Sequence, residues 1–166
     1  MPSNTPISIQ VNQIKTIVGP SEAGIIRENL KNSNHDKAIE LYYEKYSEKH
    51  RELVLDNEKI SDLLLQSISD GYKLGIVTGK ARRSLLISLE CLHMNDLFDV
   101  IITGDDVAMS KPHPEGVNKT LEQLNIKNTE GVFLGDSDAD ILAGKQANVH
   151  TIEAQWLPQL PDIRVS

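Results

Sequence analysis

The stretch that decides the fold is Val132-Phe-Leu-Gly-Asp-Ser-Asp-Ala-Asp-Ile141, in which an apolar run ends in glycine and three aspartates follow at every second position. A short apolar run closed by glycine is typical of a buried strand in a parallel sheet. The aspartates therefore follow the strand's C-terminal end, where open α/β sheets place their ligands. Carboxylates this close repel one another unless a cation neutralises them, and oxygen ligands suit Mg²⁺. The alternative is a solvated acidic turn in which Asp138 or Asp140 caps the next helix.

The second half of the chain alternates strands with helices. Short apolar runs predict strands at 73–77, 100–102, 132–134 and 150–152, and amphipathic segments between them predict helices. Such alternation is typical of an α/β fold, a Rossmann-like parallel sheet with helices on both faces.

The region 13–57 is predicted to be all helical. One helix begins after Ser21, and a second begins near Asp36. The second carries three tyrosines in one apolar stripe at helical spacing, which is either an aromatic substrate wall or, as we expect, ordinary helix packing. A region this short holds little core of its own, so we expect it to pack over the α/β part, residues 58–157.

The two ends of the chain, residues 1–12 and 158–166, are expected to be flexible tails. In the first of them Ile7, Ile9 and Val11 alternate with polar residues, which weakly indicates a strand.

Composition restricts the class of partner. The 166 residues carry a net charge of −7, which argues against a nucleic-acid or anionic-membrane surface, although a bound metal ion would still admit an anionic substrate. A single cysteine, Cys91, excludes an internal disulfide. The first residues do not resemble a secretory leader, and no apolar run approaches 18 residues, so we expect a soluble cytoplasmic protein without a membrane partner.

Polar groups follow two further strands. Thr78-Gly79 comes after the first strand, where a hydroxyl and a backbone N–H beside a helix can hold an anionic oxygen, or where the threonine caps that helix. Lys111 lies in Ser110-Lys-Pro-His-Pro114, a turn that two prolines stiffen, although a surface lysine is more often only solvated. Together with the aspartates, a hydroxyl, an amide and an ammonium group suit a phosphoryl group.

At these motifs the chain resembles the haloacid dehalogenase-like hydrolases, specifically the phosphoglycolate phosphatase-like branch with a helical cap. The matching segments are Gly75-Ile-Val-Thr-Gly79, Ser110-Lys-Pro-His-Pro114, and Phe133-Leu-Gly-Asp-Ser-Asp-Ala-Asp140 with Ala143-Gly144. The resemblance implies a Mg²⁺-dependent phosphatase that acts on a small phosphorylated metabolite through an aspartyl-phosphate.

The resemblance also implies a role for each site residue. Thr78 and Gly79 would bind the phosphoryl group, and Lys111 would offset the charge on the nucleophile and the phosphate. Asp136 would coordinate Mg²⁺, and Asp140 would support or share that coordination.

The family's first motif, Asp-x-Asp-Gly-Thr at the end of a central first strand, is absent. The first aspartate of the chain is Asp36, in a helical segment. The missing strand would lie between the strands 73–77 and 132–134, so the fold is expected to fill that position, for example with residues 7–11, or to rearrange. Unpaired sheet edges of this kind are also a route to self-association.

Three hypotheses remain open. The chain is a phosphatase whose recorded sequence lacks its beginning, a non-catalytic relative that binds a phosphorylated ligand or a protein, or a fragment that folds poorly. In each case we expect no turnover from these 166 residues and a weakened or absent grip on Mg²⁺.

Overall fold

The computed structural model describes residues 21–30, 34–54 and 57–154. Its first helices are α2 (Glu22–Asn29), α3 (His35–Leu53) and α4 (Glu58–Ser69). The α/β part then runs β1 (Gly75–Val77), α5 (Arg82–Cys91), β2 (Val100–Ile102), α6 (Glu115–Leu124), β3 (Val132–Gly135), α7 (Asp138–Gln146) and β4 (His150–Glu153). The four predicted strands and the predicted α/β fold are confirmed. The possible strand at 7–11 and both predicted tails lie outside the described residues.

The strands form two parallel pairs rather than one sheet. In the first pair Gly75 to Val77 lie opposite Val100 to Ile102, and in the second Val132 to Gly135 lie opposite His150 to Glu153. Within the described part of the chain no strand joins β1 to β3. The expectation that another segment fills this central position, or that the fold rearranges, stays a prediction, because residues 1–20 lie outside the described part of the chain.

Helices cover the two faces of the first strand pair. Val77 packs toward a buried cluster that contains Val117 of α6 and Ala143 of α7. The preceding residue, Ile76, packs toward a second cluster that contains Leu85 and Leu89 of α5. Successive strand residues point to opposite faces, so α6 and α7 lie on one side of the strands and α5 on the other.

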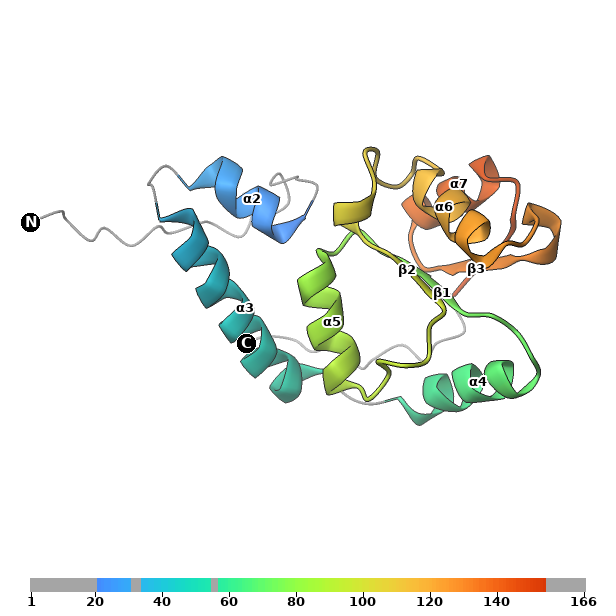
Figure 1. Cartoon of the computed structure of the whole chain (residues 1–166), viewed down its shortest axis with the longest axis horizontal. Helices are drawn as coiled ribbons and strands as arrows, with labels where there is room; N and C mark the ends of the chain where they lie inside the picture. The colour runs from blue at the N-terminus through green and yellow to red at the C-terminus, as the bar shows by residue number, and fades with distance from the viewer. Residues whose placement is uncertain (1–20, 31–33, 55–56, 155–166) are drawn as a thin grey trace, which may run out of the picture.

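Helix α3 of the helical region packs against α5 (Figure 1). Tyr43 is buried, and the Tyr46 hydroxyl lies 2.9 Å from Ser88 Oγ of α5. Arg83 of α5 donates to Glu40 at 2.7 Å from Nη2 to Oε2. The tyrosine stripe therefore serves helix packing. Among the described helices, none is both long and apolar enough to cross a bilayer.

The junction between the helical region and the strands lies close to the end of β1. The Glu22 carboxylate accepts a hydrogen bond from the Ala81 amide at 2.7 Å. Since Ala81 is four residues beyond Val77, the start of α2 lies beside the C-terminal edge of the first strand pair.

Candidate functional site

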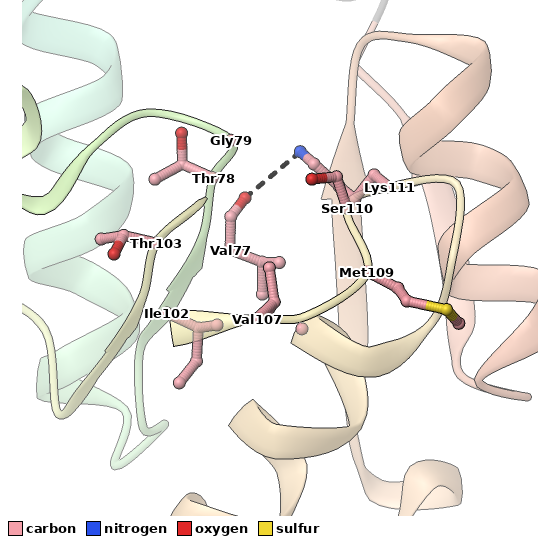
Figure 2. Close-up of a pocket in the computed structure, with 10 residues that line it drawn as sticks. Val77, Thr78, Gly79, Ile102, Thr103, Val107, Met109, Ser110 and Lys111 are labelled. Carbon is pink, nitrogen blue, oxygen red and sulfur yellow. Dashed lines mark hydrogen bonds between the residues drawn. The ribbon is translucent and has the colours of Figure 1, made fainter. Parts of the chain in front are cut away.

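The ends of β1 and β2 and the loop that carries Lys111 meet around one small pocket (Figure 2). Thr78 and Gly79 lie on one side of it, and Ser110 and Lys111 lie on the other. The structure thus brings together the residues predicted to bind a phosphoryl group, because the C-terminal ends of parallel strands share one edge.

Lys111 is the central group of this edge. Its ammonium donates to the Val77 carbonyl at 3.4 Å, the contact drawn in Figure 2, and it pairs with the Asp140 carboxylate. The side chains of Lys111 and Asp140 are 22% and 8% exposed. A lysine held this way is not an ordinary solvated surface lysine, and its ion pair joins the edge of β1 to the start of α7.

Asp140 is held by both of its oxygens. One pairs with Lys111, and the other accepts from the Ser137 hydroxyl at 2.6 Å. Ser137 is the N-cap residue of α7, and its own hydroxyl accepts from the Asp140 amide. Burial alone would raise the pKa of the Asp140 carboxyl, but the hydrogen bonds from Lys111 and Ser137 outweigh burial and hold that pKa below its usual value.

Neither carboxylate that the sequence suggested as a helix cap is the N-cap residue. Asp138 is exposed in the first turn of α7, and Asp140 is the third helical residue, which completes a reciprocal capping box with Ser137. Sequence reasoning overlooked Ser137, although Ser-x-x-Asp is a recognisable signal for such a box.

Gly135 allows Asp140 to come this close to the strand. A Cβ at position 135 would lie 2.2 Å from the Asp140 Cβ, a distance that real side chains do not reach. Gly144 plays the same part farther along α7, where an added Cβ would lie 2.2 Å from Thr151 Oγ1. Gly135 and Gly144 therefore allow α7 to lie directly against β3 and β4, which fixes the position of the Asp140 carboxylate.

Thr78 does not cap the following helix, because the N-cap residue of α5 is Ala81. The Thr78 hydroxyl oxygen accepts from the Lys80 amide at 3.2 Å, and its own proton remains available to a ligand. The Gly79 amide has no hydrogen-bond partner among the residues described. Both groups therefore keep a donor for an anionic oxygen at the mouth of the pocket.

The loop before Lys111 is held by Glu115, which the sequence did not single out. Its two carboxylate oxygens accept from the amides of Ala108 and Met109 at 3.0 and 2.9 Å. A hydrogen bond from Lys119 is the main cause that lowers the Glu115 pKa to about 2, and the two loop amides add to it. The ionised form of Glu115 therefore orders the loop that presents Lys111.

The donor set for a metal ion is small. Asp136 is exposed directly after β3, whereas Asp140 is already engaged by Lys111 and Ser137. No group of three or more His, Cys, Asp or Glu side chains suited to a metal occurs within residues 21–30, 34–54 and 57–154. Mg²⁺ is often held by one or two carboxylates together with water and substrate phosphate. The residues present fit that kind of site, with Asp136 as the free ligand.

Comparison with known proteins identifies one family and several relatives with related sequences. Residues 2–154 match the family model described as haloacid dehalogenase-like hydrolase. A pyrophosphatase PpaX of Bacillus mycoides is 37% identical over 124 residues, which are 75% of this chain and 58% of that protein. A pyrophosphatase PpaX of Bacillus cereus is 33% identical over 151 residues, 91% of this chain and 69% of that protein. This chain thus covers only part of the length of these relatives.

Solved structures show the same fold. A Thermotoga maritima protein, provisionally assigned as a β-phosphoglucomutase, matches 87% of this chain and 69% of its own with a TM-score of 0.67 and 25% identity. A haloacid dehalogenase phosphatase from Thermococcus onnurineus is 35% identical over 54% of this chain and 42% of its own, with a TM-score of 0.52.

Proposed function

This chain belongs to the haloacid dehalogenase-like hydrolase family, and we propose that it forms the phosphoryl-binding site of a phosphatase. The observation that carries the proposal is the meeting of Thr78, Gly79 and Lys111 at one pocket. A phosphoryl group spreads its negative charge over three oxygens, which hydroxyl, amide and ammonium donors bind well.

Each donor then has a role in binding. The Thr78 hydroxyl and the Gly79 amide bind phosphoryl oxygens, and Lys111 offsets their charge. Phosphatases of this family generally use Mg²⁺, and the ion would neutralise further charge on the phosphoryl oxygens. Asp136 is the residue that would hold it, with Asp140 in support.

The substrate class that we propose is a small phosphate ester or a diphosphate. The donors at the pocket recognise the phosphoryl group that both share, and the Bacillus relatives are named pyrophosphatases.

We propose that these 166 residues bind such a ligand without turning it over. The family reaction needs an aspartate nucleophile at the end of a strand that precedes the helical cap, and no aspartate occurs before Asp36. Asp36 lies in α3 and pairs with Arg27, so it does not supply that group.

Calorimetric titration with orthophosphate, with and without MgCl₂, tests binding. We expect Thr78→Val and Lys111→Met each to weaken binding by at least about ten-fold, because a hydrogen bond to a charged group contributes roughly 1.5–3 kcal/mol. Thr129→Val, which removes an exposed hydroxyl away from the pocket, is the matched control and should bind as the unaltered chain does. Equal binding by all three variants would contradict the assignment of the pocket.

A chromogenic phosphate ester tests the absence of turnover. We expect no hydrolysis above background by the 166-residue chain. Hydrolysis that Asp136→Asn abolishes would show that the chain carries a working nucleophile and would refute this part of the proposal.

A further inference from the structure

The two strand pairs face each other across a groove, here called the inter-sheet groove. It is lined by Gly75 and Val77 of β1, by Val132 and Phe133 of β3, and by Thr120 and Leu124 of α6. One helix thus forms the floor beneath both strand edges.

The backbone of β1 offers hydrogen bonds to this groove. Leu74 and Thr78 bond to the β2 side, since the Leu74 carbonyl accepts from the Val100 amide at 3.3 Å and the Thr78 amide donates to the Ile102 carbonyl at 3.0 Å. Polar backbone groups alternate from edge to edge along a strand, so those of Gly75 and Val77 point into the groove.

The backbone of β3 also offers hydrogen bonds to this groove, from the side opposite β1. The Gly135 carbonyl accepts from Ala154 beyond β4 at 2.8 Å, so the polar groups of Val132 and Leu134 point into the groove. Lys111 contacts the Val77 carbonyl at the end of β1 and Asp140 just beyond the end of β3, so the C-terminal ends of the two strands lie near each other beside the site. The groove therefore presents two ladders that one parallel strand would complete together.

We propose that residues 7–11 of this chain insert into the inter-sheet groove as a parallel strand between β1 and β3. The inference does not rest on the proposed phosphatase function, because it concerns backbone pairing alone.

The side-chain pattern of this segment matches the two faces of the groove. Thr120 and Leu124 of α6 line one face, and the side chains of Ile7, Ile9 and Val11 would pack there. The opposite face beside β3 is open among the described residues, since Val132 and Leu134 are 59% and 49% exposed. A strand with one apolar and one polar side fits this arrangement, because its apolar side would face α6 and its polar side the open face beside β3.

The connection to the described chain also fits. A parallel strand would end beside Val77, and Ala81 lies at most about 14 Å farther on, because four residues span no more than 3.6 Å each. Glu22 is bonded to that Ala81 amide. Residues 12–20 span up to about 30 Å when extended, which is ample for the link to Ser21.

The C-terminal tail is a poorer occupant of the groove. It contains Pro158 and Pro161, and proline cannot donate to the ladders of a central strand. The segment 7–11 contains no proline.

Hydrogen exchange measured by mass spectrometry tests the insertion. We expect deletion of residues 1–12 to speed exchange at the amides of residues 132–134 by at least about ten-fold, because the edge of β3 then opens to solvent. Deletion of residues 1–5, which spares the proposed strand, should leave that exchange unchanged. Equal exchange in the full chain and in the longer deletion would overturn the proposal.

Cysteine pairing tests the orientation and does not depend on a deletion that folds. In a Cys91→Ser background, Gln10→Cys with Leu134→Cys places both thiols on the open face and should give an intramolecular disulfide. Ile9→Cys with Leu134→Cys places them on opposite faces and should form at least about ten-fold less. Equal yields would overturn the proposal. Disulfides found between two copies would assign the groove to a strand from a second chain instead.

Discussion

Removal of the Lys111 ammonium is the perturbation that tests the candidate site most directly. Lys111→Met keeps the length of the side chain but leaves the Asp140 carboxylate, 8% exposed, without its cation. Breaking a buried ion pair from one side costs about 3–5 kcal/mol, and we expect about 3 kcal/mol here because Lys111 itself is 22% exposed. For a chain of this size that loss corresponds to a fall in Tm of roughly 6–12 °C.

Urea unfolding of four proteins measures the effect: the unaltered chain, Lys111→Met, Asp140→Asn and the double variant. The double variant should lose less stability than Lys111→Met alone, because it leaves no uncompensated charge. Lys49→Met is the matched control, since Lys49 pairs with Glu52 on the exposed surface of α3, and it should cost no more than about 0.5 kcal/mol.

The pH dependence supplies an independent check. The folded state lowers the Asp140 pKa, so the ionised carboxylate stabilises the fold above its usual pKa, and this contribution is lost as the pH falls through the lowered value. The gap in stability between the unaltered chain and Lys111→Met should therefore narrow below about pH 4. A cost of Lys111→Met no greater than that of Lys49→Met, or a gap that does not change with pH, would refute the reasoning.

Three further outcomes are expected. Gly135→Ala should cost about 1–3 kcal/mol in urea unfolding, because its Cβ would overlap Asp140, whereas Gly79→Ala, whose Cβ would meet nothing within 4 Å, should change stability little. Protonation of Glu115, whose pKa is lowered to about 2, should release the loop before the site as the pH falls from 4.5 toward 2, and faster amide exchange there would show it. Tyr46→Phe should cost about 1 kcal/mol in thermal unfolding, through loss of the hydroxyl contact to α5.

Much of the α/β architecture could be predicted because its signals are local. Apolar runs of strand length and the turns that end them lie within a few residues of one another. The parallel order then follows from alternation with helices, and it brings Thr78 and Lys111 to one edge. The helical region was also predictable, since the tyrosine stripe marks the face of α3 that packs on α5.

The hydrogen bonds and the ion pair that hold the site together were not predictable, because they join residues that are far apart in the sequence. Lys111 reaches an aspartate 29 residues away and a carbonyl 34 residues away. The sequence pattern suggested Asp140 as a metal ligand or a cap, but it gave no indication of the ion pair with Lys111. The capping role of Ser137 could have been predicted from the Ser-x-x-Asp signal, but the neighbouring carboxylates pointed to a metal site instead.

The inter-sheet groove and the candidate site share one chemical group, the Val77 carbonyl. In the structure this carbonyl points toward the groove and accepts from Lys111. A strand that completes the edge of β1 would offer the same carbonyl a backbone N–H, so it would compete with the ammonium for that acceptor. Lys111 would then keep Asp140 as its main protein partner and have two of its three N–H donors, rather than one, available to an anion at the pocket. Occupation of the groove should therefore strengthen orthophosphate binding, and deletion of residues 1–12 should weaken it while Thr78 and Lys111 remain in place.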